Sequence, residues 1–171
     1  MNTIDIAEVM HMAPNFRGVV PCCEIEQFKK DNVCGLIVNT DPHDKPGQHW
    51  IALYKEGQRL SFFDSFGRKI TEFPDPFASI MKDFCAHLQV KCNAMQYQNI
   101  LTDTCGEWSI YFILSRICDV KFSGFTSDTV ENEKELNIGN LSLLLNLIIF
   151  SLFSVLIVMG SDIILKNNLV E

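Results

Sequence analysis

The ten residues 97–106 read YQNILTDTCG and decide how the rest of the chain is interpreted. Cys105 opens a mostly apolar segment, 106–118, with the composition of a buried helix. A cysteine at a helix N-terminus lies at the positive end of the helix macrodipole, which lowers the thiol pKa and favours the nucleophilic thiolate. Gln98 stands seven residues before Cys105, and its amide can donate to an oxyanion that forms beside the sulfur. The stretch predicts a nucleophilic cysteine with an amide donor.

Two further polar residues stand at the ends of predicted strands. His49 lies in the run GQHW, and Asp64 follows fifteen positions later in FFDSFG. Residues 50–54 and 60–64 are β-rich runs on either side of KEGQ at 55–58, a pattern typical of a hairpin. An antiparallel pair of this length would bring the start of one strand beside the end of the other. The chain therefore supplies a general base in His49, and in Asp64 an acid that orients it.

Other residues compete for each of these roles. Cys34 also precedes a glycine, but it leads into a strand and has no amide at the same offset. Asp75 and Asp103 are weaker candidates for the acid, and Gln96 is the alternative amide donor. The remaining histidines, none of them at a strand entrance beside an aromatic residue, are His11, His43 and His87.

Composition limits the classes of protein that fit. The 171 residues suffice for one domain with an appendage, and the formal net charge of −7 argues against a nucleic-acid binder. The seven cysteines are irregularly spaced and the N-terminus lacks a cationic start, which favours reduced thiols inside a cell. Paired Cys-x-x-Cys and His spacing is missing from the sequence, so we predict neither a metal site nor a small-molecule cofactor.

The rest of the sequence up to residue 98 predicts further strands and helices. Residues 35–40 form the apolar run of a buried strand, and the turn-forming residues 41–47 predict a surface loop. We also expect short helical structure over 24–30, an amphipathic helix over 77–88 and a weaker strand over 89–98.

The C-terminal part of the chain has a different character. No charged residue occurs from 136 to 161, and residues 141–159 are almost entirely aliphatic or aromatic. About 20 apolar residues suffice to cross the hydrocarbon core of a bilayer. The stretch predicts a transmembrane helix over 141–160 that would serve as a tail anchor; the alternative is a helix buried against the domain.

Together, the motifs GQHW, FDSFG and Gln98 to Cys105-Gly106 resemble the adenain-like cysteine proteases. This is the adenovirus-protease type, which virus-like DNA transposons also carry and which is related to ubiquitin-like-protein (SUMO-type) proteases. The runs FRGVVP at 16–21 and LIVNT at 36–40 look like the first elements of that fold. The resemblance covers about 16–132, and it departs where the family continues with helices and this chain enters its apolar C-terminal stretch.

The resemblance implies an α+β, permuted papain-like fold, with the nucleophile at the N-terminus of a central helix packed on a small mixed sheet. It assigns the nucleophile to Cys105, the base to His49, the acid to Asp64 and the oxyanion donor to Gln98. Trp50 matches the aromatic residue that walls a narrow, glycine-selective cleft. The predicted division of the chain is an N-terminal segment, a C-terminally shortened protease domain, a linker, a membrane helix and a tail: 1–15, 16–132, 133–140, 141–160 and 161–171.

We therefore predict an intracellular thiol endopeptidase that cleaves glycine-containing sites in a protein precursor or a ubiquitin-like conjugate. Its partners would be protein or peptide substrates and a membrane, and nucleic acid is not expected. Two alternatives belong to other classes: a catalytically inactive, protease-like binding module, and a membrane-anchored structural protein whose cysteine is incidental.

Overall fold

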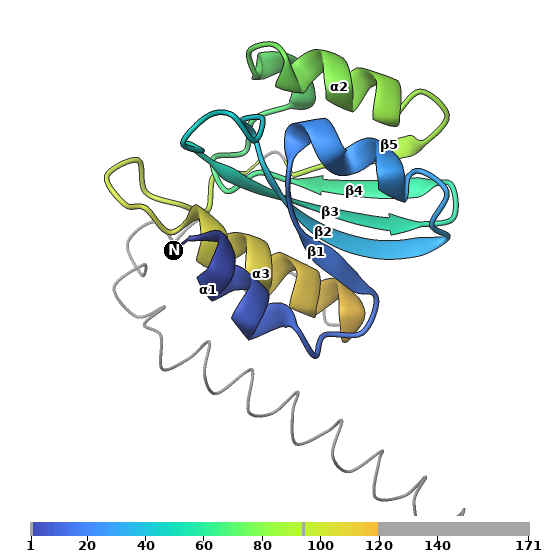
Figure 1. Ribbon diagram of the computed structural model, residues 1–171, viewed down its shortest axis with the longest axis horizontal. Coiled ribbons are helices and arrows are strands. Elements are labelled where there is room, and N and C mark those ends of the chain that lie inside the picture. The colour runs from blue at the N-terminus through green and yellow to red at the C-terminus, as the bar shows by residue number, and fades with distance from the viewer. Residues whose placement is uncertain (1, 94, 120–171) are drawn as a thin grey trace, which may run out of the picture. The chain divides into compact units, whose positions relative to one another are not determined.

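Figure 1 shows the computed structural model of the chain, which describes residues 2–93 and 95–119. These residues build a mixed five-stranded sheet with the spatial order β1-β2-β3-β4-β5. The outer pairs β1–β2 and β4–β5 are parallel, and β3 runs antiparallel to both of its neighbours. The strands are β1 (Phe16–Pro21), β2 (Val33–Asn39), β3 (Trp50–Glu56), β4 (Arg59–Phe63) and β5 (Gln89–Cys92).

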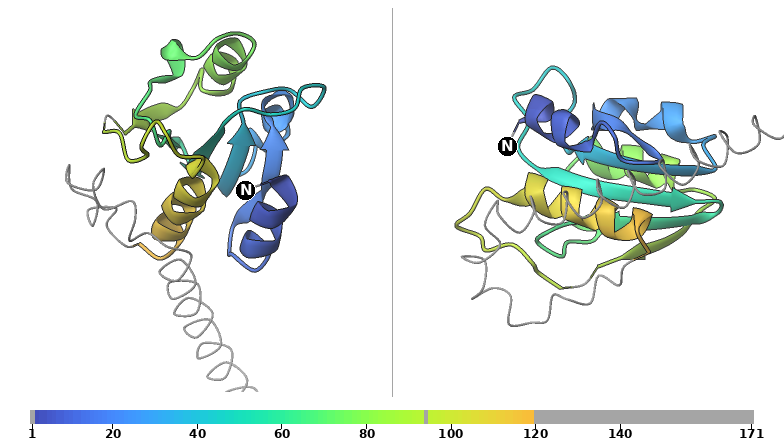
Figure 2. Two further views of the ribbon diagram at one scale, coloured as in Figure 1. Left: turned by 90° about the vertical axis from the view of Figure 1, so that its left-hand side faces the viewer. Right: turned by 90° about the horizontal axis from the view of Figure 1, so that it is seen from below.

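Helices cover both faces of this sheet (Figures 1 and 2). α1 (Thr3–Met10) and α3 (Cys105–Ile117) lie on one face, where α3 packs against β2 and β3. The 3₁₀ helix η1 (Cys22–Phe28) and α2 (Phe77–Phe84) lie on the other, with the short η2 (Ile70–Glu72) beside α2. The arrangement is the predicted α+β fold, with the helix that begins at Cys105 packed on the middle of the sheet.

β3 is buried along almost its whole length because both of its faces carry helices. Ile51 and Leu53 belong to the hydrophobic cluster that α2 and η1 complete. On the α3 face, the aromatic ring of Phe63 in β4 stacks on Phe112 at 4.8 Å between centroids. Gly35 lets α3 approach the sheet closely, since a Cβ there would lie 3.1 Å from Cγ2 of Ile113. The glycine of the rival Cys34-Gly35 pair therefore has a packing role.

The hairpin of β3 and β4 was predicted correctly. Glu56 pairs with Arg59 across a two-residue turn, and Gly57 adopts φ +58°, the left-handed conformation that type II′ turns require at their first central residue. The ladder continues without a break to the pair Ala52–Phe63. Its open end is therefore next to residues 49 and 64.

Several predicted elements differ in extent. The strand β1 was not predicted, because Gly18 and Pro21 weaken the strand pattern; an edge strand with a register irregularity near Gly18 tolerates both. The helix expected over 77–88 ends at Phe84, and the strand expected over 89–98 ends at Cys92. The helical turn expected at 24–30 is the 3₁₀ helix η1.

The transmembrane helix predicted over 141–160 lies outside the described residues. Within residues 2–93 and 95–119, none of the helices is both long and apolar enough to cross a bilayer.

Candidate active site

His49 and Asp64 meet at the open end of the β3–β4 hairpin. Nε2 of His49 donates to Oδ1 of Asp64 at 2.5 Å. The His49 residue is 8% exposed and Asp64 is fully buried. The carbonyl of His49 also accepts from the backbone N–H of Thr40, which holds the start of β3 beside the end of β2 at 3.0 Å. The pairing inferred from the hairpin spacing is confirmed.

Aromatic rings fix the plane of the His49 imidazole. The ring stacks on Phe66 at 5.2 Å between centroids and lies 6.4 Å from Phe73, with interplanar angles of 29° and 27°. Both phenyl rings stack on the imidazole, so they leave the edge of the ring, with its two nitrogens, free for hydrogen bonds. The ring is therefore oriented by packing as well as by its bond to Asp64.

Asp64 has a second cationic partner that sequence reasoning did not single out. Nε and the backbone N–H of Arg68 each donate to Oδ2 of Asp64 at 2.9 Å. The guanidinium carbon of Arg68 lies 4.3 Å from the centroid of Phe73, the ring that also faces His49. A signal was present in the sequence, because Arg68 follows Asp64 at i+4 across a Gly-containing turn, but that spacing alone does not distinguish a salt bridge from a solvated arginine.

Asn93 holds the backbone of Asp64. Its Oδ1 accepts from the Asp64 N–H at 2.9 Å, and its Nδ2 donates to the Asp64 carbonyl at 2.6 Å. The turn that follows closes with the N–H of Gly67 on the Asp64 carbonyl at 2.8 Å. Gly67 has φ +74°, and a Cβ there would lie 2.9 Å from the backbone of Met95. The position of the carboxylate therefore depends on a close approach of two backbone segments.

Cys105 is the first residue of α3, as predicted. Its thiol and the His49 side chain are close enough for each to shift the pKa of the other. Because Nε2 of His49 is used by Asp64, the nitrogen that faces the sulfur is Nδ1. The backbone N–H groups of Trp50 and Gly106 also donate to the sulfur. The three side chains thus interact in the order cysteine, histidine, aspartate, and the bond between His49 and Asp64 is the short one.

The electrostatics of this chain favour an ion pair. Burial raises the pKa of Cys105, but the hydrogen bonds from His49 and from the two backbone N–H groups outweigh it and bring the pKa below its ordinary value. Burial lowers the pKa of His49, and its bonds to Asp64 and Cys105 more than reverse that effect. Burial raises the pKa of Asp64, but His49 and Arg68 hold it lower than usual. The arrangement stabilises a thiolate beside an imidazolium.

Two hydrogen bonds join the Gln98 side chain to Ser65, the residue after Asp64, and to Thr102; neither of them joins it to Cys105. The residue is 1% exposed. Its Oε1 accepts from Oγ of Ser65 at 2.7 Å, and its Nε2 donates to the carbonyl of Thr102 at 2.5 Å. The alternative donor, Gln96, uses its own Nε2 on the backbone carbonyl of Gln98 at 2.7 Å. The oxyanion role of Gln98 stays a prediction.

The other candidates have other surroundings. Cys34 is buried in β2, and burial raises its pKa to about 11, which makes it a poor nucleophile. Asp75 accepts from the N–H and the hydroxyl of Ser79 in the first turn of α2, and Asp103 is exposed. The three other histidines are exposed; His11 contacts Glu8 and His43 contacts Cys23.

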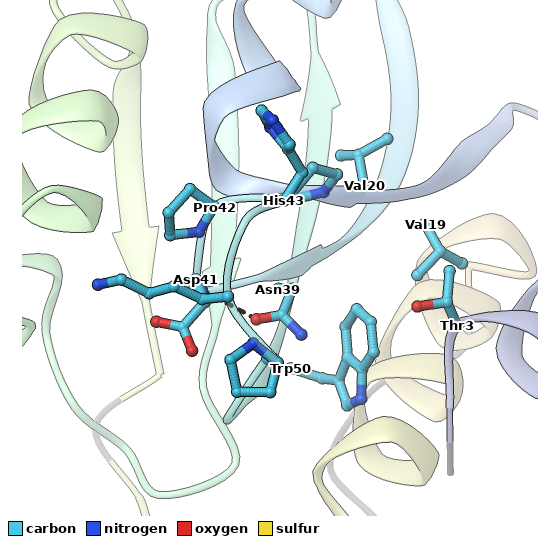
Figure 3. Close-up of a pocket in the computed structure, with 12 residues that line it drawn as sticks. Thr3, Val19, Val20, Asn39, Asp41, Pro42, His43 and Trp50 are labelled. Atoms are coloured by element: carbon cyan, nitrogen blue, oxygen red, sulfur yellow. Dashed lines mark hydrogen bonds between the residues drawn. The ribbon is translucent and has the colours of Figure 1, made fainter.

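A cavity of about 230 Å³ adjoins the site (Figure 3). Trp50 lines it together with Val19, Val20 and Asn39, and the loop after β2 closes one side. The backbone N–H of the same tryptophan helps to lower the pKa of Cys105, so Trp50 is shared by the lining of the cavity and the surroundings of the thiol. The role predicted for Trp50, as a wall of the cleft, stays a prediction.

A metal centre has no obvious place in this part of the chain. Across residues 2–93 and 95–119, no three histidine, cysteine or acidic side chains converge in a way that could hold an ion. All seven cysteines lie in the described ranges and are free thiols.

Comparison with known proteins gives viral proteases. The chain is 26% identical over 157 residues to a thiol protease of Acanthamoeba polyphaga mimivirus, a match that covers 76% of this chain and 52% of that protein. It is 27% identical over 114 residues to a cysteine protease of African swine fever virus, with 60% and 40% covered. The protease of Bovine adenovirus 4 is 25% identical over 126 residues, with 67% and 61% covered.

These matches confirm the resemblance to adenovirus-type cysteine proteases and support a cysteine peptidase. The chain spans about half the length of the curated relatives it matches. No protein-family model matches it. Among solved structures, the African swine fever virus protease is 24% identical and gives a TM-score of 0.37, with 58% of this chain and 38% of that chain covered.

Proposed function

We propose that this chain is a cysteine endopeptidase in which Cys105 is the nucleophile, His49 the general base and acid, and Asp64 the residue that orients the imidazole. The observation that carries the proposal is the short hydrogen bond between the His49 ring and the buried carboxylate of Asp64, together with the influence of His49 on Cys105, which brings the pKa of that thiol below its ordinary value. A structural cysteine at a helix start needs neither a charged partner nor a lowered pKa.

In the proposed reaction, the thiolate of Cys105 attacks the carbonyl carbon of the scissile peptide bond. The carbonyl oxygen becomes an oxyanion, to which the backbone N–H of Cys105 and the Nε2 of Gln98 would donate. The His49 imidazolium then gives its proton to the leaving amine, and the C–N bond breaks to leave a thioester. Water attacks the thioester while neutral His49 takes its proton, and the thiolate returns with the release of the acid.

We assign the substrate to the class of glycine-containing sites in a protein precursor or a ubiquitin-like conjugate. Trp50 supports this assignment, since the residue is only 9% exposed, lines the cavity and helps to lower the pKa of Cys105. A bulky ring in the wall of the cleft would leave room for a glycine, which has no side chain, next to the reacting carbonyl. Proteases of large DNA viruses and adenoviruses are the named relatives, and proteins are their substrates by class.

The experiment is a cleavage assay on a panel of glycine-containing peptides and SUMO-type conjugates. Wild type is compared with Cys105→Ala and with a matched control, Cys118→Ala, which removes the thiol that follows the last residue of the same helix. We expect cleavage by wild type and Cys118→Ala, and none by Cys105→Ala. Binding of a peptide without its cleavage by wild type would instead support the inactive binding module.

We further propose that the apolar stretch 141–160 anchors the protein to a membrane. Support comes from the sequence alone, in which no charge interrupts residues 136–161. Carbonate extraction of membranes from cells that express the chain tests this directly. A membrane anchor stays in the pellet, whereas a segment that belongs to the folded domain is released into the supernatant.

A further inference from the structure

Ser65 carries a fully buried hydroxyl that the reaction described above does not use. The residue stands directly after Asp64 in the turn that follows β4. Its Oγ donates to Oε1 of Gln98 at 2.7 Å, and its carbonyl accepts from the backbone N–H groups of Tyr97 and Gln98 at 2.7 and 3.0 Å. Ser65 therefore joins the turn that holds the acid to the segment that holds the amide.

The contacts of Gln98 determine which end of its amide points where. The carbonyl of Thr102 can only accept a hydrogen bond, so the group that faces it must be Nε2. Oε1 then faces Ser65, whose hydroxyl donates to it. An amide nitrogen carries two N–H bonds, and Thr102 uses one. The second is left for another acceptor.

We propose that Ser65 is a positioning residue that keeps the Gln98 amide in the orientation of an oxyanion donor; this inference rests on the proposed function. A rotation of the amide by half a turn would present Oε1, an acceptor, to the developing negative charge and would repel it. The Ser65 hydroxyl opposes this rotation because it satisfies Oε1 in a buried site, where an acceptor without a partner is unfavourable. Its donation also polarises the amide and strengthens the remaining N–H as a donor.

Ser65 exchanges no proton or bond with the substrate in this account. It acts only through Gln98, and that makes the effect separable from a general loss of stability. Removal of the hydroxyl should lower kcat, because the oxyanion exists only after attack, and should leave KM nearly unchanged. The thiolate of Cys105 does not depend on the amide, so its rate of alkylation by iodoacetamide should stay the same.

The kinetic test uses Ser65→Ala, Gln98→Ala and the double variant, all in the full chain. The control is Ser115→Ala, which removes another buried hydroxyl, one that donates to the carbonyl of Phe112 within α3. We expect Ser65→Ala to lower kcat by about 10-fold or more, less than the loss of the donor itself. In the Gln98→Ala background it should cost nothing further, and Ser115→Ala should leave kcat at its wild-type value. Equal losses in both backgrounds, or a wild-type kcat in Ser65→Ala, would overturn the proposal.

A second measurement needs no turnover and separates this proposal from the proposed function. In ¹⁵N-edited NMR spectra, the side-chain NH₂ of Gln98, assigned by its disappearance in Gln98→Ala, should give two resolved proton signals. Ser65→Ala should shift or broaden them, and Ser115→Ala should not. Unchanged Gln98 signals in Ser65→Ala refute the positioning role whether or not any peptide is cut. If Ser65→Ala shows the expected changes in the Gln98 signals but the wild-type protein cleaves none of the peptides, the protease function is refuted instead.

Discussion

The β3–β4 hairpin and residues 95–104 carry different parts of the site and hold them in different ways. In the hairpin, a continuous ladder of backbone pairs determines which residues lie opposite each other, and His49 and Asp64 meet at its open end. Residues 95–104 contain neither a helix nor a strand, and Gln98 is held there by bonds to Ser65 and Thr102. The backbone register of the hairpin does not depend on any one side chain, whereas the orientation of the Gln98 amide depends on its side-chain partners.

The largest effect should come from the hairpin. His49→Ala removes the group that pairs with the thiolate and transfers the proton, and we expect kcat/KM for peptide cleavage to fall by about 10⁴-fold. The loss in free energy of unfolding should be much smaller than the loss of transition-state stabilisation that this fold-change represents, because the strand ladder does not involve this side chain. His87→Ala, at an exposed position, is the matched control and should cleave at the wild-type rate. Loss of folding in His49→Ala would show that the hairpin end depends on the site it carries.

The second effect sharpens the comparison in residues 95–104. Gln98→Ala should lower kcat by about 10²–10³-fold, the usual cost of one oxyanion donor. It should also lower the melting temperature, since Ser65 and the Thr102 carbonyl lose a buried partner. Steady-state kinetics and thermal unfolding check both, with the exposed Gln89→Ala as the control. A wild-type kcat in Gln98→Ala would remove Gln98 from the proposed mechanism and leave it a structural residue.

The third prediction concerns the turn where the two regions touch. Gly67→Ala places a Cβ 2.9 Å from the backbone of Met95 and keeps a residue with a side chain at φ +74°. We expect the free energy of unfolding to fall by about 2–3 kcal/mol, from left-handed strain of about 1–2 kcal/mol plus the displacement of Met95.

Gly57→Ala separates the two causes in a chemical denaturation experiment. It has a similar φ of +58°, but its nearest neighbour lies 3.9 Å away. It should therefore show only the strain, about 1–2 kcal/mol. Equal losses in Gly57→Ala and Gly67→Ala would mean that the close approach to Met95 is unimportant.

The smallest effect should come from Arg68. Arg68→Met leaves buried Asp64 with His49 as its cationic partner, and we expect a loss of about 1 kcal/mol, reduced by the partial exposure of the guanidinium. Because the pKa of Asp64 is depressed in the folded state, this stabilisation is present above the ordinary aspartate pKa and is lost as the pH falls through the folded value. The difference between wild type and Arg68→Met should therefore shrink in acid.

Urea denaturation at neutral and at acidic pH measures that difference. Arg116→Met is the control, since Arg116 pairs with Glu56 at the exposed end of the sheet. It should have little effect at either pH. A deficit in Arg68→Met that does not change with pH would show that Arg68 acts through its aromatic contacts and not through Asp64.

The same contrast explains what the sequence could predict. The pairing of His49 with Asp64 follows from strand register, which two β-rich runs and a glycine turn define locally. The place of Cys105 follows from the start of an apolar segment. The partners of these residues were not predictable in this way. Ser65 and Asn93 act through side-chain bonds between segments whose approach no local pattern describes, and the i+4 spacing of Arg68 from Asp64 does not distinguish a salt bridge from a solvated arginine.

The direct test of the whole account is the pH dependence of thiol alkylation at two cysteines, one at each end of α3: Cys105 begins the helix and Cys118 follows its last residue. Burial raises the pKa of Cys118, at the far end of α3, while the pKa of Cys105 is lowered by His49 and by backbone N–H groups despite its burial. Iodoacetamide labelling, followed residue by residue by mass spectrometry from about pH 5 to about pH 10, compares them in one sample.

We predict that Cys105 reacts at a pH well below that at which Cys118 begins to react, and that His49→Ala moves the Cys105 profile towards alkaline pH without moving that of Cys118. Labelling of Cys105 that rises only in parallel with Cys118, in wild type as in His49→Ala, would contradict the account.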